Sequence, residues 1–312
     1  MNILIAGGAG FIGGRLCEHL LNTGHNIICI DSLCTGSLSN INHLLTHKRF
    51  TFINLDITKN ISVDFVKLDQ IYHLACPASP EQYQKDPLHT IETNYVGTRN
   101  LLDLAKQHEA RFLLTSTSEI YGDPEILPQS ESYNGNVRTM GPRSCYDEGK
   151  RIAESLVYIY SKEFSVDTRI ARIFNTYGPT MQINDGRVIS NFIVNALTNK
   201  PLVIYGKGSQ SRSFCYIDDM VNGVVALMNS QYSEPVNLGL DNEVSILEVA
   251  EKIIQLVDTQ SQIVFVEGRI DEPQQRRPLL DKAKLILKWE ATVGLEEGLL
   301  KSIDYYRALI KE

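Results

Sequence analysis

The stretch that decides the fold is NILIAGGAGFIGGRLCEHLLNTGHNIICID, residues 2–31. An apolar run, residues 2–6, leads directly into the glycine-rich turn GGAGFIGG. The following segment has leucines at helical spacing and stops at Gly24, after which a second apolar run ends in Asp31. The pattern predicts a strand, a tight turn, a helix and a second strand that carries an acid at its C-terminal end.

The glycines of this turn suit a phosphate group. Gly7, Gly10 and Gly13 would let the backbone approach a pyrophosphate at the N-terminus of the helix. Asp31, about 20 residues further on, can accept both ribose hydroxyls of an adenosine. A glycine triplet alone is a weak signal, but a triplet in this frame with the acid behind it is strong. The carboxylate should repel a 2′-phosphate, and the following SLCTGSLSN has no Lys or Arg, so we expect NAD rather than NADP.

Apolar runs alternate with helical segments through the first half of the chain. The expected strands are FTFINLDI (50–57), QIYHLA (70–75), RFLLTS (111–116) and VDTRIARIF (166–174), and the expected helices span about 87–107 and 146–164. This alternation predicts an α/β fold with a doubly wound parallel sheet of the Rossmann type. The two helices could lie on one face of the sheet and form the seam of a homodimer, or they could pack as ordinary core; the pattern favours neither.

After FNTYGP (174–179) the alternation becomes irregular, and a second domain is expected to begin. We expect residues 1–175 to bind NAD and carry the catalytic groups, and residues 176–312 to form mainly a smaller α/β substrate-binding lobe, with some segments returning to the first domain. The expected strands lie in 201–220, 235–239 and 261–267, and the expected helices near 217–228, 245–257 and 294–310.

Tyr146 and Lys150 stand four residues apart in YDEGK, a spacing that places both on one helical face. A free tyrosine titrates near pH ~10 and is a poor base at neutrality, so a cation one turn away would stabilise its phenolate. Thr117 ends an apolar run and could hydrogen-bond the phenol or a substrate hydroxyl. Together the three groups can remove a proton from an alcohol while a cofactor takes the hydride. Tyr-x-x-x-Lys is also a common surface pair, and the N-terminal glycine turn is what favours catalysis.

Composition favours a soluble enzyme. The chain has 312 residues, of which 43% are hydrophobic, enough to bury a full core. A net charge of −7 argues against broad contact with nucleic acid or anionic membrane. The six cysteines lie far apart without a CxxC pair, which predicts reduced thiols in a cytoplasmic chain and no metal site. The N-terminus has no basic segment typical of a signal peptide, and no apolar run reaches membrane-spanning length.

These motifs resemble the extended short-chain dehydrogenase/reductases that act on nucleotide sugars, and the resemblance runs nearly end to end. Within that family, STSEIYGDPE, GPRSCYDEGKR, ARIFNTYGP, INDGRVISNFI and GSQSRSFCYIDDMVNG look most similar to the UDP-glucuronic acid decarboxylases, or UDP-xylose synthases. The resemblance implies that Tyr146 removes the C4 hydroxyl proton of UDP-glucuronate while NAD takes the hydride. The resulting 4-keto acid then loses carbon dioxide, and the hydride returns to C4.

Ser118 and Glu119, which follow Thr117, bear on the choice of reaction. Related 4,6-dehydratases usually have Asp-Glu here, because an acid must protonate a departing hydroxyl, whereas decarboxylation expels none. The related 4-epimerases commonly lack the glutamate. The resemblance therefore implies decarboxylation, with a UDP-hexuronate or UDP-hexose 4-epimerase as the nearest alternative. A non-catalytic NAD-sensing protein is a third, which would not need a proton-abstracting set.

The expected site residues are spread along the chain. Those expected at NAD are Gly7, Gly10, Phe11, Ile12, Gly13, Asp31, Asp56, Ile57, Leu74, Asn94, Tyr146 and Lys150. Those expected at the UDP-sugar are Tyr83, Asn175, Arg187, Tyr205, Arg212 and Arg276. The expected catalytic residues are Thr117, Ser118, Glu119, Tyr146, Lys150 and Arg276, the last in DEPQQRRP.

The resemblance gives several of these residues a role. It implies that Arg212 binds the UDP phosphates and that Arg276 lies near the carboxylate or C5, whereas the neighbouring Arg277 is expected at the surface. Thr180 and Leu279 depart from the family, in which Arg and Asp are common at these positions. These departures bear on substrate affinity and on the geometry of Arg276.

Overall fold

The computed structural model describes residues 1–183, 185–268 and 275–311. Asn184 of INDGRVISNFI and residues 271–274 of DEPQQRRP lie outside the described residues. The described chain divides into two compact units. The first comprises Met1–Ile120, Arg138–Arg172 and Val221–Val236, and the second comprises Tyr121–Val137, Ile173–Met220 and Asn237–Glu312.

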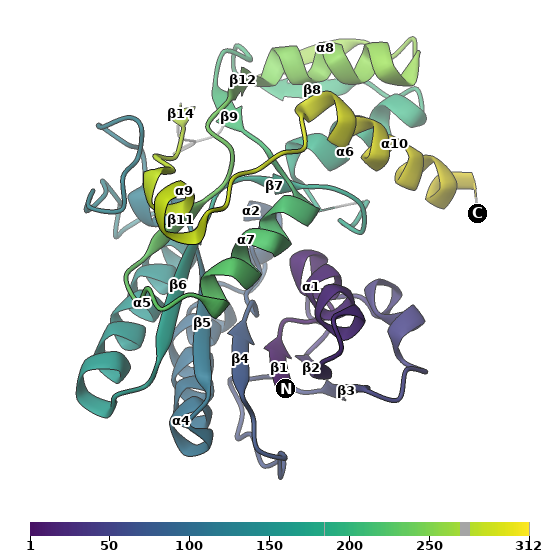
Figure 1. The fold of residues 1–312 in the computed structure, drawn as a ribbon. Coiled ribbons are helices and arrows are strands. Elements are labelled where there is room, and N and C mark those ends of the chain that lie inside the picture. The colour runs from purple at the N-terminus through teal and green to yellow at the C-terminus, as the bar shows by residue number, and fades with distance from the viewer. Residues whose placement is uncertain (184, 269–274, 312) are drawn as a thin grey trace. The chain divides into compact units, whose positions relative to one another are not determined.

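A seven-stranded sheet with the order β11-β6-β5-β4-β1-β2-β3 forms the centre of the fold (Figure 1). Its strands are β1 (Asn2–Ala6), β2 (Asn26–Asp31), β3 (Phe50–Asn54), β4 (Gln70–His73), β5 (Arg111–Thr117), β6 (Thr168–Ile173) and β11 (Val236–Leu238). β1 pairs in parallel with both β2 and β4, and the pairs β2–β3 and β4–β5 are also parallel. The predicted α/β class with a parallel Rossmann sheet is confirmed.

The order of the strands places the glycine turn at a switch point. The chain runs outward from β1 to β2 and β3 on one side and to β4 and β5 on the other. Ala6 is in register with Ile30 of β2 and with His73 of β4, so the C-terminal ends of the three strands meet. Ligands of doubly wound sheets bind at such a point, outside the carboxyl ends of the strands.

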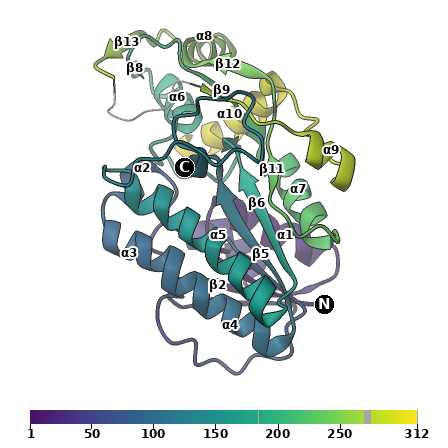
Figure 2. The same cartoon turned by 90° about the vertical axis from the view of Figure 1, so that its left-hand side faces the viewer.

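Three helices of the first unit matter for the site. They are α1 (Phe11–Asn22), α4 (Thr98–His108) and α5 (Ser144–Phe164). The helix predicted over 87–107 is present as α3 (Pro87–Glu92), a π-helical turn η3 (Thr93–Gly97) and α4. The predicted 146–164 helix is confirmed as α5, which lies beside α3 and α4 (Figure 2).

The π turn has a local cause. The Thr93 hydroxyl donates to the carbonyl of His89 at 2.7 Å, and the Asn94 amide donates to the carbonyl of Thr90 at 3.0 Å. Side chains that bond carbonyls four residues back compete with the backbone amides of the helix. Such turns inside helices are frequent at functional sites.

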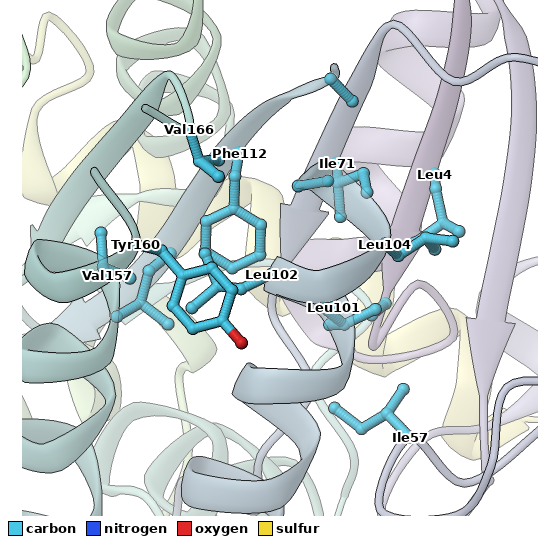
Figure 3. Close-up of a cluster of buried hydrophobic side chains, with 14 of the residues drawn as sticks. Leu4, Ile57, Ile71, Leu101, Leu102, Leu104, Phe112, Val157, Tyr160 and Val166 are labelled. Atoms are coloured by element: carbon cyan, nitrogen blue, oxygen red, sulfur yellow. The ribbon is translucent and has the colours of Figure 1, made fainter. Parts of the chain in front are cut away.

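An apolar cluster fixes the helices on the sheet (Figure 3). Leu4 and Phe112 of the strands and Leu101 of α4 are fully buried in it. Tyr160 of α5 joins the same cluster, and its hydroxyl donates to Asp103 Oδ1 of α4 at 2.6 Å. This contact holds α5, which carries the expected Tyr and Lys, against α4.

The second unit contains short strands and several helices. Its strands are β7 (Thr176–Tyr177), β8 (Leu202–Tyr205), β9 (Ser211–Ser213), β10 (Cys215–Tyr216), β12 (Glu243–Ser245), β13 (Ile263–Val266) and β14 (Gln275–Arg276). Its helices are α6 (Val188–Leu197), α8 (Ile246–Val257), α9 (Asp281–Leu287) and α10 (Leu295–Lys311), and α7 (Ile217–Asn229) runs from this unit into the first. The remaining short helices of the chain are η1 (Leu38–Asn40), η2 (Asn42–Leu44), α2 (Pro80–Tyr83) and η4 (Ser118–Tyr121). Helices α6 and α9 were not expected from the sequence.

Each cysteine is a free thiol in the structure, and Cys34 is the exposed one. Among the described residues, no helix is both long and apolar enough to cross a bilayer. Over the same residues, no group of three or more His, Cys, Asp or Glu could hold a metal ion.

Candidate active site

The glycine turn is held by close backbone packing. Gly7 has a φ of 80°, in the left-handed region that favours glycine, and its amide donates to the carbonyl of Ile30 at 2.8 Å. A Cβ at Gly13 would come within 2.0 Å of the Gly7 carbonyl oxygen. The start of α1 can therefore lie on the turn only if residue 13 has no side chain.

The N-terminus of α1 is suited to a pyrophosphate. Its N-cap is Gly10, which offers no side-chain cap, and its first turn, from Phe11, holds no acidic residue. The first amides of a helix lack intrahelical acceptors, and the helix dipole favours an anion there. Phe11 and Ile12 stand in this turn as expected from the sequence, and the turn fits the phosphates of NAD.

Asp31 lies at the C-terminal end of β2 beside this turn. Its Oδ2 accepts the amide N–H of Ala9 at 2.9 Å, and its Oδ1 accepts that of Leu33 at 2.8 Å. Burial raises the pKa of Asp31, although both backbone hydrogen bonds act in the opposite direction. The two bonds fix the carboxylate, and each oxygen keeps a further lone pair that could accept a ribose hydroxyl.

The other expected cofactor residues follow the neighbouring strands. Asp56, after β3, accepts the amide of Thr58 at 2.9 Å, and its Oδ2 lies 3.0 Å from His89 Nε2. Burial raises the pKa of Asp56, but the bonds from Thr58 and His89 outweigh it and lower the pKa overall. This carboxylate therefore already has two partners, and its expected contact with NAD stays a prediction.

Ile57, Leu74 and Asn94 are more enclosed. Ile57 packs in the apolar cluster of Figure 3. Leu74 follows β4, and its amide donates to the carbonyl of Ala6 at 2.8 Å. Asn94 is fully buried in the π turn, where its amide nitrogen lies 3.1 Å from Cys76 Sγ.

The structure brings Tyr146 and Lys150 together on α5. Both are buried, and Lys150 Nζ lies 5.9 Å from the centroid of the Tyr146 ring. Nζ also donates to the carbonyl of Thr115 on β5 at 3.0 Å. Burial lowers the pKa of Lys150, because the ammonium loses hydration. A cation so close to the ring can stabilise the phenolate, as the spacing in the sequence predicts.

Tyr83 of α2 is stacked on this tyrosine. The two ring centroids are 5.0 Å apart, with an angle of 7° between the planes. Tyr83 is only 1% exposed, and its hydroxyl has no hydrogen-bond partner within the described part of the chain. Burial raises the pKa of Tyr83, which keeps the phenol protonated. The residue thus covers one face of Tyr146, and its direct contact with substrate stays a prediction.

Thr117, Ser118 and Glu119 lie where β5 passes into η4. The amide of Glu119 donates to Thr117 Oγ1 at 3.2 Å, and Ser118 is buried. The carboxylate of Glu119 forms an ion pair with Arg143, which immediately precedes α5. Arg143 was missed in the sequence, although its place three residues before Tyr146 is about one helical turn away.

Two arginines of the second unit lie side by side. Arg212 of β9 and Arg276 of β14 are direct partners in a parallel pair of strands, and they are 6% and 5% exposed. Arg212 Nη1 donates to the carbonyl of Ser211 at 2.8 Å. Like charges at paired positions repel each other, and a bound anion relieves that repulsion. The pair can therefore form part of a phosphate or carboxylate site.

The remaining expected substrate residues also lie in the second unit. Tyr205 of β8 is 37% exposed. Arg187 precedes α6, and its Nε lies 2.6 Å from Asp185 Oδ1. The carbonyl of Asn175 accepts the amide of Cys215 at 2.9 Å. Arg277, expected at the surface, has a side chain that is 41% exposed.

Comparison with known proteins identifies the class. Residues 3–239 match the NAD dependent epimerase/dehydratase family. The chain belongs to this family, which confirms the resemblance to nucleotide-sugar dehydrogenase/reductases. It is 52% identical over 305 residues to UDP-glucuronic acid decarboxylase 1 of Xenopus tropicalis, with 98% of this chain and 72% of that protein covered. It is 50% identical over 300 residues to UDP-glucuronic acid decarboxylase 6 of Arabidopsis thaliana, with 96% and 87% covered.

A solved structure is similar over the whole chain. The UDP-glucuronic acid 4-epimerase of Bacillus cereus, in complex with UDP-glucuronic acid and NAD, superposes with a TM-score of 0.87 at 30% identity. The match covers 99% of this chain and 100% of that one. The fold found here is therefore one that holds NAD and a UDP-sugar in that epimerase.

Proposed function

We propose that this protein is an NAD-dependent UDP-glucuronic acid decarboxylase that converts UDP-glucuronate to UDP-xylose. The observation that carries the proposal is the set of side chains at the end of β5, in η4 and on α5. Thr117, Tyr146 and Lys150 are suited to oxidation at an alcohol carbon, and Glu119 stands two residues after Thr117. Identity of about half the residues to named decarboxylases over nearly the whole chain supports the same reaction.

The residues of the first unit divide the chemistry between them. When bound, NAD accepts a hydride from C4 of the sugar and later returns it. Buried Lys150 stabilises the phenolate form of Tyr146, and this phenolate takes the proton of the C4 hydroxyl and becomes a phenol. The 4-keto group then lies β to the C5 carboxylate, so the electrons of the breaking bond flow into the ketone. The protein orients the sugar and stabilises the enolate, which takes up a proton at C5 before the hydride returns to C4.

Ser118 and Glu119 favour decarboxylation over the 4,6-dehydration and 4-epimerisation that related enzymes catalyse. Ser118 is buried and carries a hydroxyl, which is a poor acid for expelling hydroxide from C6. Decarboxylation needs no such acid. Glu119 is a charged group that can order the ring or a water beside C5 as carbon dioxide leaves.

We also propose that the second unit recognises the anionic substrate. Arg212 binds the UDP phosphates, and Arg276 binds the carboxylate or lies beside C5, because a guanidinium matches both groups. Tyr205 contacts the uracil, and Asn175 and Arg187 are further residues that bind the UDP-sugar. Residues 1–175 thus act mainly in cofactor binding and catalysis, and residues 176–312 mainly in substrate binding.

We also propose that the protein is a homodimer and is located in the cytoplasm. Large apolar side chains are exposed on α3, η3 and α5, namely Leu88, Ile91, Tyr95, Ile152, Tyr158, Ile159 and Phe164. An exposed apolar surface of this kind is typical of an interface between subunits. The six free thiols agree with a reducing compartment.

The proposal is tested by incubating the purified protein with UDP-glucuronate and NAD. Decarboxylation releases carbon dioxide and yields a nucleotide sugar lighter by the mass of that molecule. A 4-epimerase would leave the mass unchanged, and a sensor would leave the substrate unchanged. Either of those results would contradict the assignment.

A further inference from the structure

Arg143 links the two segments that carry the catalytic residues. It is the N-cap of α5, and its carbonyl accepts the amides of Tyr146 and Asp147, both at 3.0 Å. Its guanidinium pairs with Glu119, and its Nε lies 3.5 Å from Asp147 Oδ2. The backbone of one residue thus starts the helix of Tyr146, while its side chain holds the carboxylate that follows Thr117.

The ion pair is largely enclosed. The side chains of Arg143 and Glu119 are 17% and 14% exposed. Burial opposes the charge on Arg143, but the negative charges of Glu119 and Asp147 outweigh it and raise the pKa of the guanidinium. The titratable side chain of Tyr83 also acts on this arginine. In such surroundings, removal of Arg143 takes away a close counter-charge of the Glu119 carboxylate.

We propose that Arg143 is the positioning residue for Glu119 and holds its carboxylate charged and correctly aimed while carbon dioxide leaves. The inference rests on the proposed decarboxylation. The bond from the Glu119 amide to Thr117 Oγ1 fixes only the backbone of η4. The direction of the carboxylate depends on the side chain, and Arg143 forms an ion pair with that carboxylate. A guanidinium can face Glu119 and Asp147 at once, whereas a lysine offers one point charge.

A purely structural role for Arg143 makes different predictions. Arg151, also on α5, supplies the matched control, because its Nη1 donates to the carbonyl of Ile120 in the same turn at 2.9 Å. It therefore supports η4 through the backbone. If Arg143 only kept η4 folded, substitution of Arg143 and substitution of Arg151 would lower kcat to a similar extent.

The experiment compares Arg143→Gln, Arg143→Lys, Glu119→Gln, the double variant Arg143→Gln/Glu119→Gln and Arg151→Gln. Misplacement of one catalytic group costs roughly 10²-fold in rate, so we expect that loss of kcat in Arg143→Gln. KM for UDP-glucuronate, NAD affinity and Tm should change little. Arg143→Lys should recover part of the rate, and Arg151→Gln should stay close to the wild type.

The double variant is the decisive comparison. If Arg143 acts through Glu119, then Arg143→Gln adds no further loss once Glu119→Gln is present. The pH profile of kcat gives a second readout. Without its counter-charge, the Glu119 carboxylate is more easily protonated, so the acidic limb should move to higher pH in Arg143→Gln. The shift should be absent when Glu119 is already Gln.

Multiplicative losses in the double variant together with an unmoved pH profile would overturn the inference. If Arg143→Gln does not fold, Arg143→Lys with and without Glu119→Gln decides in the same way. Product analysis of the wild type comes first. If the wild type releases no carbon dioxide, the proposed function is wrong, and the role of Arg143 is wrong with it. If the wild type releases carbon dioxide but the two substitutions lower kcat independently, only the role of Arg143 is wrong.

Discussion

Tyr146 is the residue on which proton removal depends. The Tyr146 ring is stacked on Tyr83, and the ammonium of Lys150 lies near it. Loss of the Tyr146 hydroxyl should therefore leave the packing around the ring nearly unchanged. We expect Tyr146→Phe to lower turnover by at least the roughly 10²–10⁴-fold typical of a lost general base. NAD affinity, measured by calorimetric titration, should stay nearly unchanged. Appreciable remaining activity would contradict the role of Tyr146.

Asp31 decides between the two nicotinamide cofactors. Its carboxylate is fixed by the amides of Ala9 and Leu33, and it should repel a 2′-phosphate. Asp31→Ala should therefore weaken binding of NAD more than binding of NADP, with both dissociation constants measured by the same titration. Equal losses for the two cofactors would place this acid away from the ribose.

For single residues, the sequence predicts which residues belong to the site better than it predicts which of them are in contact. The spacing of Tyr146 and Lys150 is a local property of a helix, and it could be predicted. The pairing of Arg143 with Glu119 joins residues 24 positions apart, and it depends on how the segment before α5 folds back to η4. No periodicity in the sequence encodes that contact.

Among the elements, the glycine turn is the most tightly constrained. A Cβ at Gly13 would overlap the Gly7 carbonyl, and overpacking of this kind costs about 1–3 kcal/mol. Gly13→Ala should lower the free energy of unfolding by about that amount and weaken NAD binding. Gly294→Ala is the control, since nothing lies within 4 Å of the added Cβ. An equal effect of the two substitutions on NAD binding would show that the turn does not depend on close packing.

Some helices and strands could be predicted from sequence patterns, and others could not. The strands and helices of the first 175 residues could be predicted because a parallel sheet gives long apolar runs. The π turn within 93–97 could not, because it depends on side-chain bonds from Thr93 and Asn94 to carbonyls one turn back. Helix α6 was missed because its sequence, VISNFIVNAL, is apolar over most of its length and shows no clear polar face.

At the scale of the whole molecule, the proposed dimer gives the clearest prediction. Tyr158 of α5 is 64% exposed among the apolar residues of the proposed interface. Tyr158→Glu would place a charge there, and light scattering should show the mass of a monomer. Leu285→Glu, on α9 at 69% exposure, should leave the wild-type mass unchanged. A wild-type monomer, or a dimer that tolerates Tyr158→Glu, would contradict the proposed interface.

The order of the segments in the whole chain is harder to predict than their type. Val221–Val236 belongs to the first unit although segments of the second unit precede and follow it in sequence. Periodicity indicates that 217–228 is helical, but it does not say which sheet the helix covers or which strand lies beside β11. Those choices depend on contacts between distant segments.

In the proposed reaction, the protein oxidises C4, releases carbon dioxide and reduces C4 again with the same bound cofactor. The most direct test supplies UDP-glucuronate with deuterium at C4 and analyses the product by mass spectrometry and NMR. We expect UDP-xylose that carries the deuterium at C4, together with free carbon dioxide. A product that keeps its carboxylate, or UDP-xylose in which the deuterium has been lost from C4, would contradict the proposed reaction.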